Sequence, residues 1–263
     1  MSAPPPLIAS RNVFIRRGGR HVLNGLDFSI GAGENVAILG PNGCGKSTLI
    51  KTITRELYPD PDVPGSSLSI HGKQVWNIFD LRPLLGIVSY DLVDACSRND
   101  YPCLEIVLSG FHSSIGIWPN HVVTPEMETR AAEVMELLEI PHLAERRINE
   151  LSSGEARRVV MARALVHGPK SLILDEPTNS LDLHAMHELR EIVRKIVADG
   201  TGVILVTHHL PDIIPEISRV IMLREGRVFL DAAKTEALTS ANLSALFRTE
   251  VDLAERGGYY HAW

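Results

Sequence analysis

The feature that most limits the fold of this chain is a glycine-rich segment, residues 40–48, which reads Gly-Pro-Asn-Gly-Cys-Gly-Lys-Ser-Thr. It fits the pattern G-x-x-x-x-G-K-[ST], in which glycines let the backbone curl until several N–H groups point at one phosphate. The apolar run at 36–39 predicts a buried strand, and residues 46–53 predict a helix. A strand, a glycine loop and a helix in this order predict a phosphate-binding loop in an α/β domain.

Two side chains of this loop have chemistry suited to a nucleotide. The ammonium group of Lys46 can reach the β- and γ-phosphates, and the hydroxyl of Ser47 can bind Mg²⁺. The helix that begins near Lys46 adds the positive end of its dipole. The loop therefore predicts a site for a nucleotide and its metal ion.

A second motif ends an apolar strand with two carboxylates. Residues 171–174 read Ser-Leu-Ile-Leu, and Asp175 and Glu176 follow them. Asp175 can join the ligand shell of Mg²⁺, and Glu176 can orient and polarise an attacking water molecule. Together with the phosphate loop, this pair predicts hydrolytic chemistry.

The remaining pattern predicts how the domain is organised. Apolar runs at 36–39, 172–174, 203–206 and 220–223 alternate with helical patterns at 46–53, 156–166 and 183–197, which indicates a parallel sheet covered by helices. Residues 13–30 instead predict a small antiparallel sheet with tight turns at 18–19 and 24–25. From 90 to 150 the strand signal fades, and residues 126–140 predict a helix. We therefore expect a helical insertion in the sheet domain.

Composition excludes several other classes. Lys+Arg is 26 and Asp+Glu is 32, so the net charge is −6. This charge argues against a protein that coats nucleic acid nonspecifically, because such a protein needs a basic face. No apolar run approaches the ~20 residues that cross a bilayer, so we expect no direct membrane insertion. The three cysteines are too few for a disulfide framework, and a reducing compartment is the simplest interpretation.

A third motif points to a family. Residues 151–155, Leu-Ser-Ser-Gly-Glu, precede a helical run and predict that Ser152 caps the helix with Glu155 three residues on. In the company of the two motifs above, this segment resembles the signature sequence of ATP-binding-cassette (ABC) ATPases. The resemblance to this family continues through residues 175–182 and residues 206–209. The resemblance covers about residues 8–226 and follows the family's order and spacing. Residues 107–111, 152–155 and 238–247 also resemble single-cassette ATPases of the molybdenum-transport or photorepair type, and the tail resembles those of iron-chelate importers.

The resemblance implies a P-loop (RecA-like) nucleotide-binding domain with an N-terminal antiparallel β subdomain and an inserted α-helical subdomain. It also implies a head-to-tail homodimer, in which each ATP lies between the phosphate loop of one subunit and the signature of the other. By this resemblance Ser152 and Gly154 contact the γ-phosphate across the interface. Asp182 would cross to the opposite site, and His208 would contact the γ-phosphate within its own subunit.

The chain departs from the family at three places. Arg17 stands where members place an aromatic ring under adenine, and either Arg17 or Phe14 can take that role. Tyr90 stands where most members have a Gln that touches Mg²⁺; either Asp91 replaces it or the loop works differently. Ser153 and Glu155 replace the commoner Gly and Gln of the signature, and the sequence predicts that Arg157 and Arg158 temper the charge of Glu155.

The expected site residues follow from these motifs and from the resemblance. The catalytic residues are Glu176, His208 and Lys46, and the Mg²⁺ ligands are Ser47, Asp175 and Asp91. The signature that acts across the dimer is Ser152, Ser153, Gly154 and Glu155, and Asp182 lies in the loop that follows the two acids. ATP is bound by Gly40, Pro41, Asn42, Gly43, Cys44, Gly45, Lys46, Ser47, Thr48 and Arg17.

By the resemblance, the chain is a single ABC nucleotide-binding domain over residues 1–263 that hydrolyses ATP with Mg²⁺. Within it, 7–90 and 155–232 form the β subdomain and core, 91–154 the helical subdomain, and 233–263 a short C-terminal extension. The expected role is the cytoplasmic ATPase subunit of a membrane transporter, an importer of metal-chelate or oxyanion type held at the inner face by permease subunits. The alternatives are a non-transport ABC ATPase acting on nucleic acid or another macromolecule, and a slow nucleotide-gated switch.

Overall fold

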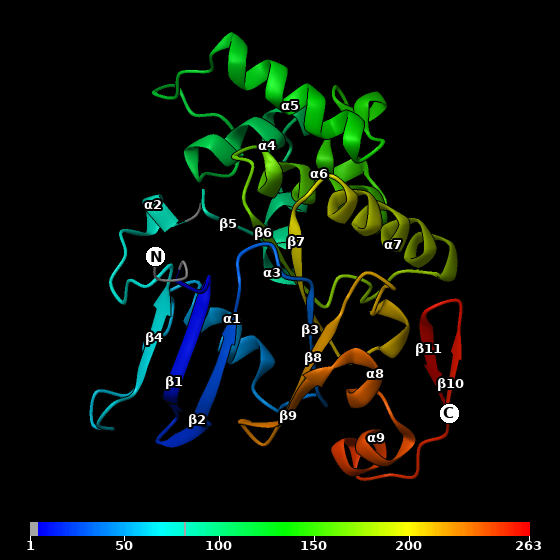
Figure 1. Ribbon diagram of the computed structural model, residues 1–263. Helices are drawn as coiled ribbons and strands as arrows, with labels where there is room; N and C mark the ends of the chain where they lie inside the picture. The colour runs from blue at the N-terminus through cyan, green and yellow to red at the C-terminus, as the bar shows by residue number, and fades with distance from the viewer. Residues whose placement is uncertain (1–4, 82) are drawn as a thin grey trace. The chain divides into compact units, whose positions relative to one another are not determined.

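The computed structural model describes residues 5–81 and 83–263, and it is a mixed α/β protein with parallel strands, as predicted (Figure 1). The chain divides into two compact units, one of residues up to 78 together with 204–263, the other of residues 79–203. The predicted subdomain boundaries at 90/91 and 154/155 are not the boundaries of these units, and the predicted division stays a prediction.

The first unit contains an antiparallel sheet. Strands β1 (Ile8–Arg17), β2 (Arg20–Ile30) and β4 (Ser67–Ile70) lie in the order β2-β1-β4 (Figure 1). The predicted turn at Gly18 and Gly19 joins β1 to β2, and both glycines have positive φ angles of 55° and 78°. The turn predicted at 24–25 is wrong: β2 continues through it, and the register slips between the pairs Val13↔Leu26 and Phe14↔Asn24. Gly25 is therefore the extra residue of a β-bulge, where its φ of 75° is tolerated.

The same unit holds the strands that carry the phosphate loop. Strand β3 (Val36–Leu39) is buried and lies between β7 (Gly202–Thr207) and β8 (Arg219–Arg224), with both pairings parallel. Strand β9 (Arg227–Ala233) runs antiparallel to β8. Helix α1 (Lys46–Ile53) has the predicted bounds. Strands buried on both faces are continuous apolar runs, which is why the sequence located them well.

The C-terminal part of the first unit has elements that the sequence analysis did not predict. A 3₁₀ turn η4 (Leu210–Asp212) is followed, after β9, by α8 (Lys234–Ala237), α9 (Ser240–Phe247) and a hairpin of β10 (Leu253–Arg256) and β11 (Tyr259–Ala262). The hairpin lies against η4, and Tyr260 is buried at 8% exposure, whereas Trp263 is 72% exposed.

The second unit is mainly helical. Strands β5 (Leu85–Val88) and β6 (Ser171–Asp175) pair in parallel. As predicted, residues 90–150 form helices: α3 (Tyr90–Ser97), α4 (Cys103–Leu108), η1 (Ser109–His112), α5 (Pro125–Leu137), η2 (Pro141–Leu143) and η3 (Ile148–Glu150). Helix α5 ends before 140 because Glu139 has a left-handed φ of 59° and Pro141 cannot continue the helix. A short α2 (Ile78–Leu81) precedes β5.

Two longer helices complete this unit. Helix α6 (Ser153–Leu165) packs against α3, α4, α5, α7 and β5, and residues 159–162 are fully buried. Helix α7 (Leu183–Ala198) buries one face, with Leu189, Ile192, Val193 and Ile196. In this part of the chain α6 is therefore the central helix.

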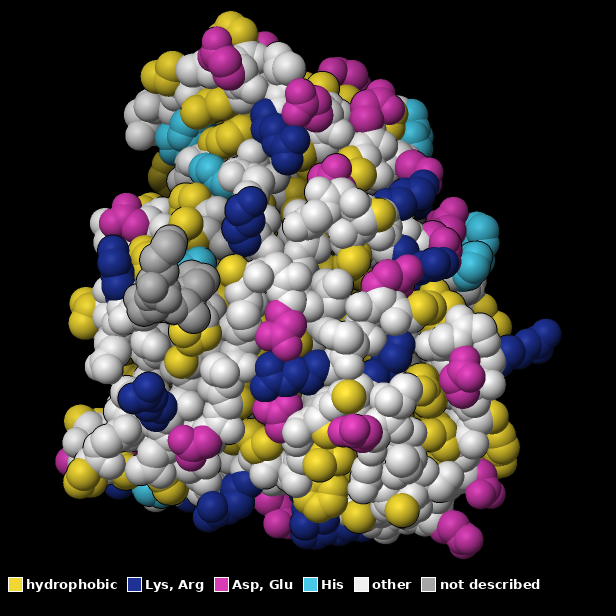
Figure 2. Space-filling view, viewed as in Figure 1, with side chains coloured by type: hydrophobic (Ala, Val, Ile, Leu, Met, Phe, Trp, Pro, Cys, Tyr) yellow, Lys and Arg dark blue, Asp and Glu magenta, His cyan; other side chains and the backbone are white. Residues whose placement is uncertain are grey.

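Figure 2 shows acidic and basic side chains interspersed on the face it presents. Among the described residues, none of the helices has the length and apolar character needed to cross a bilayer.

Candidate nucleotide-binding site

The segment between β3 and α1 has a backbone that requires its glycines. A Cβ on Gly40 would collide with the carbonyl oxygen of Leu223 and lie 2.7 Å from Cys44 Sγ. Gly45 has a φ of 113°, and a Cβ there would lie 2.6 Å from Leu23 Cδ2. A larger residue at either position would push the loop away from the neighbouring strands.

The start of α1 faces the loop without a side-chain cap. Gly45 is the N-cap residue and has no side chain to offer, so no side chain caps the first turn of the helix, and a helix start of this kind suits an anion. Lys46 is buried, and its Nζ donates to the carbonyl oxygens of Gly40 at 2.7 Å and Pro41 at 3.2 Å. Ser47 is exposed, while Thr48 is buried. The ammonium group thus lies across the loop, and the Ser47 hydroxyl is open to a metal ion.

His208 follows the strand next to this loop. The N–H of Gly40 donates to the carbonyl of Thr207 at 3.4 Å, so the loop begins beside the end of β7. The Thr207 hydroxyl accepts from the N–H of His209 at 2.9 Å and donates to the buried carboxylate of Asp212 at 3.1 Å. This pair of bonds holds the turn on which His208 lies. The sequence did not point to Asp212: a Thr at a strand end commonly bonds the N–H two residues on, but this pattern does not indicate which carboxylate accepts from its hydroxyl.

The two carboxylates lie at the end of β6 in the second unit. Both Asp175 and Glu176 are half-buried. Glu176 has a left-handed φ of 50°, and its carbonyl accepts from the N–H of Asn179 at 3.1 Å. A non-glycine residue rarely adopts this conformation, so the surrounding structure holds Glu176 in a strained turn.

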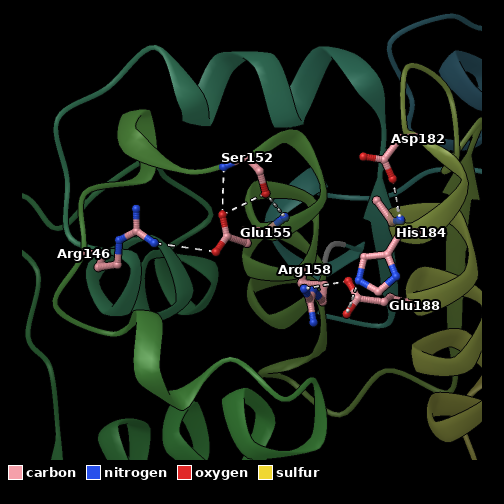
Figure 3. A network of polar contacts seen from close by, with 8 residues as sticks. Arg146, Ser152, Glu155, Arg158, Asp182, His184 and Glu188 are labelled. Carbon is pink, nitrogen blue, oxygen red and sulfur yellow. Dashed lines mark hydrogen bonds and ion pairs between the residues drawn. The ribbon is translucent and has the colours of Figure 1, made fainter.

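The signature segment forms the predicted cap of α6 (Figure 3). The Ser152 hydroxyl accepts from the N–H of Glu155 at 3.3 Å, and the Glu155 carboxylate accepts from the N–H of Ser152 at 2.9 Å. The capping-box prediction is confirmed. These hydrogen bonds from Ser152 to the carboxylate lower the pKa of Glu155, with a smaller contribution from the nearby arginines.

Of the two arginines predicted to temper the charge of Glu155, Arg158 contributes and Arg157 does not. Arg157 is 3% exposed and points away from Glu155 to the carbonyl oxygens of Pro177 and Asn179. Arg146 instead lies 3.6 Å from the Glu155 carboxylate, and Arg158, which pairs with Glu188 at 3.4 Å, contributes only at longer range. The sequence could have warned of this, because Val160 and Met161, three and four residues after Arg157, are apolar and share its helix face.

The signature and the loop after the two acids are held together in this unit. A Cβ on Gly154 would lie 3.4 Å from the Cβ of Ala185 near the start of α7. Asp182 caps α7 by accepting from the N–H of Ala185 at 2.8 Å (Figure 3). The N-termini of α6 and α7 therefore meet, and Ser152 and Asp182 lie at their ends.

Comparison with known proteins agrees with this arrangement. Residues 23–179 match the family described as ABC transporter. The chain belongs to the ABC transporter family. It is 32% identical to the hemin import ATP-binding protein HmuV of Aliivibrio fischeri, with 94% of this chain and 92% of the relative covered.

Two solved structures are similar to this ABC protein. One is CbiO1 from Clostridium perfringens, part of the ABC transporter complex cbiONQ, at 27% identity and a TM-score of 0.75, covering 92% of this chain and 94% of that one. The other is a dimeric ATP-binding cassette in a post-hydrolysis state bound to ADP and Pi, at 26% identity and a TM-score of 0.67, covering 86% and 98%. The chain is an ABC-type ATPase.

The ABC protein has a helix at the position where the resemblance led us to expect a Gln. Ser89 caps α3 by accepting from the N–H of Leu92 at 3.2 Å, Tyr90 is the first helical residue, and both Tyr90 and Asp91 are exposed. Asp91 lies in the first turn, where the helix dipole favours a carboxylate. Asp91 therefore has a structural reason to be acidic, the stabilisation of α3, in addition to the predicted role as a metal ligand.

The hairpin at the start of the ABC protein holds the two candidates for the adenine contact. The Phe14 ring meets His21 edge-on at 5.2 Å and lies over Gly25, and it is half-buried, whereas Arg17 is exposed. His21 Nε2 lies 2.7 Å from the buried carboxylate of Asp60, and this hydrogen bond lowers the pKa of Asp60. Phe14 is engaged within the hairpin, and Arg17 is the more accessible of the two.

Proposed function

We propose that this ABC ATPase binds MgATP on residues 40–48 and hydrolyses it as a head-to-tail homodimer. The observation that carries the proposal is the loop itself, whose glycines at 40 and 45 allow no side chain and whose helix α1 begins uncapped. Anionic phosphates bind well at such a helix start. Lys46 then exchanges its own loop carbonyls for the β- and γ-phosphates, and Arg17 is the proposed adenine contact.

The chemistry of the donors fits Mg²⁺. The exposed hydroxyl of Ser47 and the carboxylates of Asp175 and Asp91 are the hard oxygen ligands that this ion takes in nucleotide sites. Bound there, the ion would neutralise charge on the phosphate oxygens. These three residues are therefore the proposed metal ligands.

The other site residues have separate proposed roles. Glu176, held in its left-handed turn, accepts a hydrogen bond from the attacking water and polarises it. His208 and Lys46 stabilise the charge that spreads over the γ-phosphate oxygens. Ser152, Ser153 and Gly154 bring the start of α6 to the γ-phosphate bound by the partner subunit, and Asp182 crosses to that same site.

Transport is the proposed use of this hydrolysis. A relative that imports hemin and a solved homologue that is part of a transporter complex support a subunit that energises permeases at the inner face of the cell membrane. We infer an importer of metal-chelate or oxyanion type, with the ATPase on the cytoplasmic side. Dimer closure would then be the step that moves the permease.

The decisive experiment compares the wild-type chain with Glu176→Gln. The variant should bind ATP, lose most turnover and accumulate as a dimer in MgATP, measured by steady-state hydrolysis and sedimentation. Asp199→Asn, which removes an exposed carboxylate at the end of α7, is the matched control and should behave as wild type. Near-wild-type hydrolysis by Glu176→Gln would remove Glu176 from catalysis. Purification from membranes tests transport, because a polytopic membrane protein should accompany the chain at near one-to-one stoichiometry.

A further inference from the structure

The hydroxyl of Ser152, proposed to meet the γ-phosphate of the partner's ATP, already has an anionic partner. It donates to Glu155 Oε2 at 2.8 Å, and the same carboxylate oxygen accepts the Ser152 N–H at 2.9 Å (Figure 3). A hydroxyl has a single proton to donate. Ser152 can therefore donate to Glu155 or to a phosphate oxygen, but not to both.

The carboxylate is also well placed to compete for the charge at this helix end. Glu155 lies in the first turn of α6, where the helix dipole favours an anion, and its lowered pKa keeps it ionised near neutral pH. A γ-phosphate brought to the same turn meets a like charge. With Gln, the commoner residue of the signature, this repulsion would be missing.

Arg146 offers the carboxylate a second partner. Its guanidinium lies 3.6 Å from Glu155 Oε1, the oxygen that Ser152 does not use. Both side chains are partly exposed, at 46% for Arg146 and 26% for Glu155, so each has room to move. Arg158 is less suited to this role, since it is paired with Glu188.

We propose that Glu155 is a positioning residue that holds the Ser152 hydroxyl between turnovers and must give it up to the γ-phosphate, moving toward Arg146, before two subunits close on ATP. The inference rests on the proposed dimeric function. It makes Glu155 a brake on closure: the residue raises the ATP concentration needed for activity without taking part in the chemistry. Arg146 weakens the brake by neutralising the carboxylate.

The first test replaces the charge and keeps the cap. Gln at position 155 is the other capping-box residue, so Glu155→Gln leaves α6 capped while removing the negative charge. We expect the ATP concentration for half-maximal hydrolysis to fall about tenfold, with the effect on this concentration rather than on kcat, and the difference to shrink at high salt. Glu188→Gln makes the same change on α7 without touching Ser152, and should stay within about twofold of wild type. An unchanged value for Glu155→Gln, or one matched by Glu188→Gln, would overturn the proposal.

A second variant tests the same contact from the other side. Arg146→Gln leaves the carboxylate without its neutralising partner, so the half-maximal ATP concentration should rise about threefold. In a Glu155→Gln background the same change should have no effect, because there is no charge left to neutralise. Equal effects of Arg146→Gln in both backgrounds would contradict the proposed link. If Glu155→Gln lowers thermal stability, Arg146→Gln alone tests the inference. In that case an Arg146→Gln chain whose half-maximal ATP concentration is not raised overturns the inference.

Ser152→Ala separates this inference from the function on which it rests. A Ser152→Ala chain that dimerises in ATP and hydrolyses it like the wild type would overturn the proposed role of the signature. A Ser152→Ala chain that is impaired, together with an unshifted Glu155→Gln chain, would leave that role standing and overturn only the role of Glu155.

Discussion

Arg157 gives the most quantitative prediction from this structure. Its guanidinium is buried inside the second unit and donates to two backbone carbonyls, those of Pro177 and Asn179, the latter through both terminal nitrogens at 3.2 Å. These carbonyls belong to the segment that connects Glu176 with Asp182. Replacing Arg157 by Met keeps much of the side-chain volume and removes every one of these hydrogen bonds.

The expected loss of stability follows from the number of bonds and the burial. A hydrogen bond to a charged group contributes roughly 1.5–3 kcal/mol, but the cost of burying the guanidinium disappears with it. Because the buried carbonyl of Pro177 and the part-buried carbonyl of Asn179 lose a donor, we expect Arg157→Met to lower the free energy of unfolding by about 2–3 kcal/mol. For a chain of this size that lowers Tm by roughly 4–6 °C.

The assay is thermal unfolding followed by circular dichroism, with Arg158→Met as the matched control. Arg158 is the next residue of α6 and makes one 3.4 Å ion pair with Glu188, so its loss should cost less than about 1 kcal/mol. We also expect kcat of Arg157→Met to fall on the order of tenfold at a temperature where the variant is folded, since the loop that holds Glu176 and Asp182 loosens. Equal Tm values for the two variants would refute the energetic reasoning. A lowered Tm with wild-type kcat would refute the link from Arg157 to the catalytic loop.

Three further predictions concern the nucleotide site. Lys46→Ala should weaken ATP binding itself, because it removes the ammonium group proposed to contact the β- and γ-phosphates. Equal ATP affinity of the variant and the wild type in a direct titration would count against the assignment of the phosphate-binding loop. Cys44 is only 4% exposed, so alkylation should be slow, and saturating MgATP should slow it further; identical rates would mean that the thiol does not face the nucleotide. Asp91→Ala should lower kcat and raise the Mg²⁺ requirement while Tyr90→Phe does little, since a carboxylate binds a hard cation better than a phenol. Unchanged Mg²⁺ dependence of Asp91→Ala would leave that residue with only its place in the first turn of α3.

Local chemistry made several parts of this protein predictable. The strand at 36–39 and the helix at 46–53 have the expected bounds, because a continuous apolar run and a glycine loop each limit the backbone directly. The cap of Ser152 by Glu155 was predictable for the same reason, as its atoms are three residues apart. By contrast, the glycine at 25 was assigned to a turn, and only pairing with β1 makes it a bulge.

The sequence by itself thus determined the phosphate loop, the strand that ends in two acids and the signature cap, since each consists of residues close together in the chain. The order of these local motifs along the chain indicated the family. Tertiary structure alone decided which distant groups meet. It placed Arg146 rather than Arg157 beside Glu155 and turned Arg157 inward to the carbonyls of Pro177 and Asn179. The physical reason is that a long charged side chain has no preferred partner in the sequence: burial on one helix face and the approach of another segment choose it.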